Sequence, residues 1–142
     1  MSQQVGARRP WVRTRVAHPV RNLDRSVAFY RDLLGLSLTG GFRDHAGYDG
    51  AFFALPGGGE LELTAGPVEP DGGTAEDLIV FYVAKLDDVA QIADELLAAG
   101  IASTPAENPY WNHWGRMLVD PDGYRVVIAA QGDDETHEDG GR

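Results

Sequence analysis

The sequence predicts an α+β fold in which two βαβββ modules make up one domain. Three observations predict it: a helical pattern that occurs twice at a fixed offset, strand-like segments around each copy, and Gly- and Pro-rich turns between those segments. A chain of 142 residues has the length of one domain, or of two small units that share a core. We expect each module to place one helix outside a small mixed sheet, and the two sheets to form a cupped cavity.

The helical pattern begins at Leu23 in the first half of the chain and at Leu86 in the second half, an offset of 63 residues. A constant offset is the trace that a duplicated unit leaves in a sequence. Apolar residues three to four apart predict an amphipathic helix in both copies, and each helix is expected to end near a glycine. Asp24 and Asp87 lie near the two helix starts, where a carboxylate can cap free N–H groups.

Strand candidates stand before and after each helix. They are residues 14–20, 37–42, 51–55 and 60–64 in the first half, and 78–83, 101–104, 116–119 and 124–129 in the second half. We therefore divide the chain into a flexible N-terminus (1–11), a single domain (12–131) and an acidic disordered tail (132–142). The domain comprises modules 12–65 and 77–131, joined by a linker (66–76) that contains two Pro and three Gly.

Composition narrows the possible partners. The net charge of −10 argues against nucleic-acid binding, which depends on neutralising phosphates, and is compatible with a cationic ligand. The absence of cysteine excludes disulfides, thiolate metal sites and a cysteine nucleophile. No apolar run approaches the length of a membrane span, and the first residues lack the apolar stretch of a secretory signal. We expect a cytoplasmic protein that binds neither membranes nor nucleic acid.

Two segments carry a family likeness. Residues 22–36, Asn-Leu-Asp-Arg-Ser-Val-Ala-Phe-Tyr-Arg-Asp-Leu-Leu-Gly-Leu, resemble the first helix of glyoxalase/bleomycin-resistance/dioxygenase proteins, the vicinal-oxygen-chelate superfamily. The turn Asp120-Pro121-Asp122-Gly123-Tyr124 resembles the one that opens their last strand. The resemblance extends over roughly residues 12–131. It implies a cup-shaped sheet from each module, paired within the chain or across a homodimer, and commonly a divalent metal in the cavity.

The resemblance also identifies the positions where such a metal would be held. Its usual ligands are a His on the first strand and a Glu on the last strand of each module, which correspond here to Arg15, Glu62, Leu78 and Val127. One ligand of four cannot hold a divalent ion, since such sites use about three or more protein ligands. His18 lies three residues after Arg15, so strand alternation points it to the opposite face; we expect a structural histidine, or a ligand in a shifted register.

Arg15 and Glu62 are expected to be neighbours on the cavity face, because the first and last strands of a module lie side by side in this superfamily. The guanidinium would supply the positive charge of the missing metal and keep the carboxylate ionised. The pair could be a structural ion pair or could contact a ligand. Alternation predicts a charged wall in the first module and a mostly apolar wall in the second: Arg13, Arg15, Glu60, Glu62 and Thr64 against Leu78, Val80, Tyr82, Arg125 and Val127.

Three large rings occur within residues 108–114, a segment predicted to be a loop. Aromatic side chains exposed without a role are costly to solubility. We expect them to line the cavity, to pack in a dimer interface or to pack in the core. The predicted ligand-binding residues are Arg15, Glu62, Tyr48, Tyr82, Tyr110, Trp111, Trp114 and Arg125.

Together these features favour a protein that binds a small organic molecule, cationic or aromatic, without a metal, in the manner of the superfamily's antibiotic-sequestering members. The alternative is a metal-dependent glyoxalase-like lyase or isomerase, or a ring-cleaving dioxygenase. A third hypothesis is a metal-free enzyme with Glu62 as general base, although a neighbouring Arg15 would lower the pKa of that carboxyl and weaken it as a base.

Overall fold

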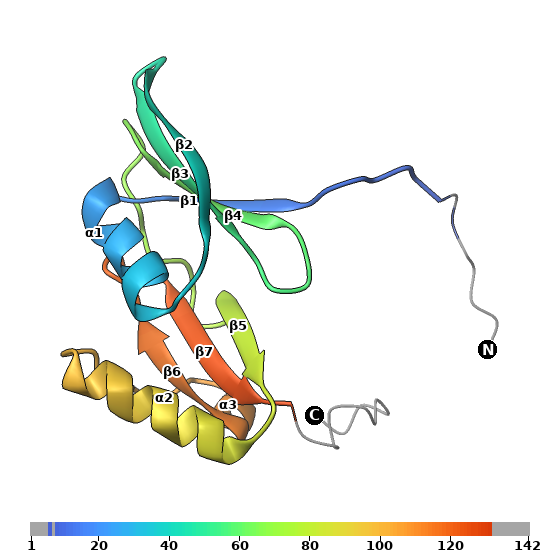
Figure 1. The fold of residues 1–142 in the computed structure, drawn as a ribbon, viewed down its shortest axis with the longest axis vertical. Coiled ribbons are helices and arrows are strands. Elements are labelled where there is room, and N and C mark those ends of the chain that lie inside the picture. Colours follow the sequence, from blue (N-terminus) through green and yellow to red (C-terminus); the bar gives the residue numbers. More distant parts are fainter. Residues whose placement is uncertain (1–5, 7, 132–142) are drawn as a thin grey trace.

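The computed structural model describes residues 6 and 8–131 and shows two small mixed sheets, each with a helix packed against it (Figure 1). The predicted tail (132–142) and most of the first seven residues lie outside the described residues. The first sheet has the strand order β1-β4-β3-β2 and the second β5-β7-β6. Their strands are β1 (Arg15–Pro19), β2 (Leu38–His45), β3 (Tyr48–Ala54), β4 (Glu60–Ala65), β5 (Leu78–Val83), β6 (Gly115–Val119) and β7 (Arg125–Ala130).

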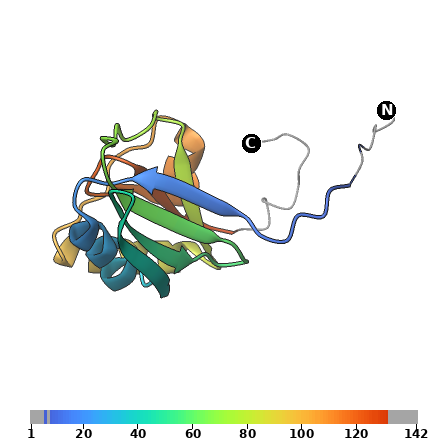
Figure 2. The same cartoon turned by 90° about the horizontal axis from the view of Figure 1, so that it is seen from above.

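In each sheet the first strand of the module runs parallel to the last one, β1 beside β4 and β5 beside β7, and the other pairs are antiparallel. The predicted fold class, α+β with two βαβββ modules, is confirmed. Residues 8–14 continue the line of β1 and run away from the body of the molecule in both views (Figures 1 and 2).

The two repeated helices are found where the pattern predicts them. α1 (Leu23–Val27) continues into a π-helical segment, η1 (Ala28–Leu33), and α2 spans Leu86–Ala98. Gly35 and Gly100 follow the helices with φ of 74° and 93°, the left-handed conformation that glycine adopts without strain. None of the helices in the described part of the chain is long and apolar enough to cross a membrane.

The helix caps differ from the prediction. The side chain of Asn22 accepts a hydrogen bond from the backbone N–H of Arg25 at 3.0 Å, and Asp88 accepts one from the N–H of Lys85 at 3.3 Å. The predicted caps Asp24 and Asp87 are therefore wrong. Both lie within the first turn instead, where a negative charge still complements the helix dipole.

The second module also differs in its middle. The predicted strand 101–104 is reduced to a single bridge between Thr104 and Met117, and the predicted loop 108–114 contains a short helix, α3 (Pro109–Trp114). The Asn112 side chain accepts from the N–H of Ala106 at 2.8 Å and donates to its carbonyl at 3.0 Å. These bonds occupy the backbone groups that a continuing strand would use for pairing, so the segment turns into α3.

The helix-facing sides of both sheets contribute to one core. It combines Phe53, Leu61 and Leu63 of the first sheet with Val126 and Ile128 of the second, all 5% exposed or less. Apolar burial of this kind is the main favourable term in folding. Because one cluster contains residues of both modules, the modules are packed as one domain.

A polar contact also joins the modules. Asp120 and Asp122, in the turn between β6 and β7, are only 4% and 6% exposed. Tyr30 of the first module donates its hydroxyl to Asp120 at 2.6 Å, and Ser26 donates to Asp122 at 3.2 Å. The backbone N–H of Arg21 donates to Asp122 at 3.1 Å. We call this set, Arg21, Ser26, Tyr30, Asp120 and Asp122, the turn lock.

Tyr30 is the central donor of the turn lock. Burial of its phenol raises its pKa far above the ordinary value of 10, and the nearby carboxylate of Asp120 raises it further. The hydroxyl therefore keeps its proton at physiological pH and remains a donor to Asp120.

Removing that hydroxyl should destabilise the protein. Tyr30→Phe leaves the ring in place but deprives a buried carboxylate of one donor, so we expect the free energy of unfolding to fall by about 1.5–3 kcal/mol. Urea denaturation measures the change. Tyr48→Phe, which removes a hydroxyl on β3 outside the turn lock, is the matched control. Equal stabilities of the Tyr30 variant and this control would contradict the assigned role.

Candidate functional site

The first sheet carries a charged face on the side away from the core. β1 and β4 pair in a register that places Arg15 opposite Glu60. The Nε of Arg15 lies 3.3 Å from Oε1 of Glu60, and its Nη1 lies 3.5 Å from Oε1 of Glu62. The predicted contact between Arg15 and Glu62 is confirmed. Glu60 is a second partner of the same guanidinium, so one cation lies between two carboxylates.

An aromatic ring underlies this cation. Phe52 on β3 stands opposite Glu62 across the strand pair, and the guanidinium carbon of Arg15 lies 4.4 Å from the centre of its ring. That distance is typical of a cation–π contact. Phe42 on β2 lies next to Phe52, with ring centres 5.8 Å apart. We call Arg15, Glu60, Glu62, Phe42 and Phe52 the charged face.

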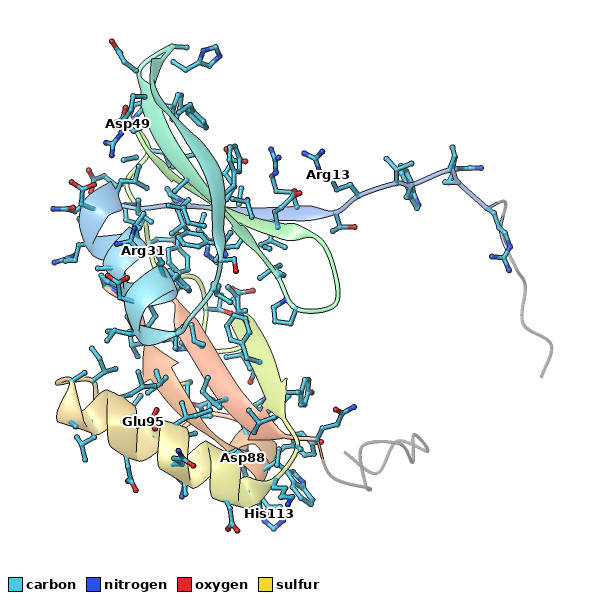
Figure 3. All side chains as sticks on the ribbon, in the orientation of Figure 1. Arg13, Arg31, Asp49, Asp88, Glu95 and His113 are labelled. Atoms are coloured by element: carbon cyan, nitrogen blue, oxygen red, sulfur yellow. The ribbon has the colours of Figure 1, made fainter. Side chains whose placement is uncertain are left out.

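Arg13 extends the charged face along β1. Its Nε lies 3.1 Å from Oε1 of Glu60, and Figure 3 places it where the chain leaves the body of the molecule. The side chains of Arg15, Glu60 and Glu62 are 34%, 22% and 18% exposed. These groups are half-buried, so solvent screens their mutual attraction only in part.

The four positions implied for a metal do not form a metal site. Glu62 is paired with a guanidinium, and Leu78 and Val127 offer no donor atom. The described residues contain no group of three or more His, Cys, Asp or Glu side chains that could hold a metal ion. Because a divalent cation needs several oxygen or nitrogen ligands, these residues do not fit one.

The corresponding face of the second sheet is covered by the chain itself. Trp111 of α3, 8% exposed, packs in one cluster with Met117 and Val127, and Val127 is fully buried. Of the three roles left open for the aromatic segment, core packing is the one that Trp111 performs within the chain. Tyr110 packs against the same cluster, whereas Trp114 packs against the main core.

The structure does not gather all the predicted ligand-binding residues in one place. Arg15 and Glu62 meet on the charged face, and Tyr48 lies on the neighbouring β3 with its ring against Gly66. Tyr82 is 45% exposed on β5 in the other module. Arg125 donates to the carbonyl of Thr74 at 2.9 Å. Glu60 and Phe52 are the residues that the predicted list lacks. Strand alternation from Glu62 points to Glu60, whereas Phe52 is placed there by the register between β3 and β4.

His18 lies on the opposite side of β1 from Arg15, as alternation predicts. Its ring stacks on Tyr124, with ring centres 4.3 Å apart and planes 15° from parallel. Its Nδ1 is buried and has no hydrogen-bond partner. Burial lowers the pKa of His18 below the ordinary 6.5, while Asp120 and Asp77 act in the opposite direction. The imidazole is therefore neutral at physiological pH.

Comparison with known proteins identifies the family of this chain. Residues 14–64 match the YycE-like N-terminal domain and residues 76–130 the YycE-like C-terminal domain. The YycE protein of Bacillus subtilis strain 168 is 38% identical over 121 residues, which is 80% of this chain and 84% of the relative. The chain belongs to the YycE-like family. That family lies within the vicinal-oxygen-chelate superfamily, so the predicted resemblance is confirmed.

Solved structures agree with this assignment. The crystal structure of Bacillus subtilis YycE superposes with a TM-score of 0.78 at 35% identity, covering 84% of this chain and 90% of that one. The fosfomycin resistance protein FosX of Listeria monocytogenes gives 0.71 at 15% identity, covering 87% and 96%. Glyoxalase I of Leishmania major gives 0.66 at 22% identity, covering 82% and 84%. The last two share the fold.

If Trp111 packs in the core as described, its removal should cost stability. Trp111→Ala should lower the free energy of unfolding by about 3–5 kcal/mol, because it opens a large cavity over Val127. Trp11→Ala removes the same side chain from a position that is 82% exposed and should have little effect. Chemical denaturation compares the two; equal effects would show that Trp111 does not hold α3 on the sheet.

The low pKa of His18 predicts a pH-dependent stability. Since the unfolded chain takes up a proton near pH 6.5 and the folded chain does so only at lower pH, the folded state loses relative stability as pH falls below 6.5. His18→Phe keeps a ring against Tyr124 but removes this titration. Melting temperatures measured from about pH 7.5 to about pH 5.5 should fall less in the variant than in the native protein. Parallel curves would contradict a lowered pKa.

Proposed function

We propose that this protein binds a small organic molecule with a cationic group and an aromatic part at the charged face, without a metal. The observation that carries the proposal is the position of Arg15, between Glu60 and Glu62 and over the ring of Phe52. A side-chain cation already occupies a place where two carboxylates and a ring converge. A ligand cation would use the same carboxylates, and its aromatic part would stack on Phe52 and Phe42.

The net charge of the whole chain, rather than that of the face, supports a cation over an anion. Glu60 and Glu62 both stay partly exposed, and the chain as a whole carries a net charge of −10. Such a field raises the local concentration of cations and lowers that of anions. A FosX structure from Listeria monocytogenes is a complex with Mn(II) and a dihydroxypropylphosphonic acid. Here Arg13 and Arg15 are already paired with Glu60 and Glu62, which would repel an anionic ligand of that kind, so we do not extend it to this chain.

We further propose that a second copy of the chain covers the charged face in a homodimer. In the described chain this face has no covering helix, whereas α3 covers the equivalent face of the second module. β1 and β5 each lie at the edge of their sheet, with backbone groups available for pairing. A dimer that uses these edges would enclose the ligand and remove the two exposed strand edges together.

Binding is tested with aromatic amines and their uncharged isosteres, tryptamine against 3-ethylindole being one pair. Isothermal titration calorimetry should show saturable binding of the amine only. Glu62→Gln should weaken it by about tenfold or more, since a charge-assisted contact is lost. Glu76→Gln makes the same charge change at an exposed position outside the charged face and should bind as the native protein does.

Three results would overturn the proposal. Stoichiometric metal in the purified protein, measured by elemental analysis, would favour the metal-dependent lyase, isomerase or dioxygenase. Equal loss of binding in the Glu62 and Glu76 variants would show that binding depends on the net charge of the protein and not on the charged face. Sedimentation velocity on the same samples measures the oligomeric state. A protein that is monomeric with and without ligand would contradict the proposed homodimer.

A further inference from the structure

A pocket of about 500 Å³ lies at the junction of the two modules, away from the charged face. Val16, His18 and Leu61 line it from the first sheet, and Leu78 and Ile79 from β5. These first-sheet residues alternate with Arg15, Glu60 and Glu62 and therefore point to the other side of the sheet. We propose that this pocket is a second binding site, for a small uncharged molecule with an apolar body and one hydroxyl group.

The size and lining favour a compact apolar body. Pockets for small ligands commonly measure about 300–1,000 Å³ and are lined mainly by apolar side chains with a few polar groups. Here Val16, Leu55, Leu61 and Ile79 form the apolar part. The rings of His18 and Tyr124, stacked on each other, form a flat wall beside them. We therefore propose a ligand whose apolar body is a single six-membered ring.

His18 supplies the polar contact. Its Nδ1 is shielded from solvent and has no partner, and a buried polar atom without a partner is unfavourable. A neutral imidazole carries one donor and one acceptor nitrogen, and a hydroxyl group can serve either of them. His18 lines the pocket and its ring is held against Tyr124, so a ligand hydroxyl would bond to the ring nitrogen that faces the pocket, with a small shift of the ring where that nitrogen is Nδ1. The proposed ligand therefore carries one hydroxyl group.

The rim of the pocket favours an uncharged ligand. Asp77 and Arg125 both line it, and their charges are opposite. Each is held by the linker, since Asp77 accepts from the N–H of Thr74 at 2.7 Å and Arg125 donates to the Thr74 carbonyl at 2.9 Å. With both charges fixed and close to balanced, neither an anion nor a cation gains from entering. A phenol or a cyclic alcohol meets all of these conditions.

Phenol is the probe, and toluene, which has the same shape without the hydroxyl, is its matched control. Ligand-observed NMR titration should show phenol binding about fivefold to tenfold tighter than toluene, as expected for one added hydrogen bond. The ¹⁵N resonances of the His18 imidazole should shift with phenol only. His18→Phe keeps a ring against Tyr124 and should bind both compounds with equal affinity.

A second variant blocks the pocket. Val16 is 43% exposed at the pocket, so Val16→Trp can place a larger side chain there without burying it in the core, and phenol binding should be lost. Val119→Trp makes the same change at a residue that is 41% exposed on β6 and does not line the pocket; it should bind phenol normally. Phenol binding that survives Val16→Trp would overturn the site.

Phenol and toluene binding with equal affinity to the native protein would overturn the assigned contact with His18. Glu62→Gln separates this site from the charged face, because it should leave phenol binding unchanged while it weakens the binding of tryptamine. Loss of tryptamine binding alone, or of phenol binding alone, therefore tells which of the two sites has failed.

Discussion

Two buried carboxylates in one tight turn are the constraint on which the arrangement of the modules depends. A carboxylate removed from water must receive hydrogen bonds, and Asp120 and Asp122 receive theirs from Tyr30, Ser26 and the backbone of Arg21 in the other module. The same turn closes the β6–β7 hairpin, where the backbone N–H of Tyr124 donates to Asp120 at 2.9 Å. The carboxylates of Asp120 and Asp122 thus accept the hydrogen bonds that close the hairpin of the second module and those that join it to the first module.

The duplicated unit nevertheless gives two different faces. The first module keeps its outer face accessible and fills it with paired charges over a ring, whereas the second module covers its face with Trp111 from its own short helix. Val127 occupies a position where the superfamily's metal ligand is expected, and its burial under that helix shows why an apolar residue suits it there. The repeat preserves the topology, while the polarity of each face follows from what covers it.

Sequence patterns predicted those features that depend on periodicity. Strand alternation was enough to turn His18 away from Arg15, and together with the strand adjacency that the family resemblance implies it placed Arg15 beside Glu62. The helix caps, the loss of the strand at 101–104 and the short helix α3 were not predictable in this way. They depend on single side chains that bond to nearby backbone, such as Asn112 with Ala106, and no periodic signal accompanies such bonds.

β1 connects the charged face with the pocket at the module junction. Arg15 belongs to the charged face and Val16 and His18 to the pocket, so neighbouring residues of one five-residue edge strand serve two different surfaces. Its only partner strand among the described residues is β4, which likewise directs Glu62 to one surface and Leu61 to the other. A shift of β1 along β4 would move both sets of side chains together. The turn lock opposes such a shift, because the chain runs from β1 directly into Arg21, whose backbone is bonded to Asp122. The charged face and the apolar pocket are therefore both held in place by the turn lock, which is part of neither.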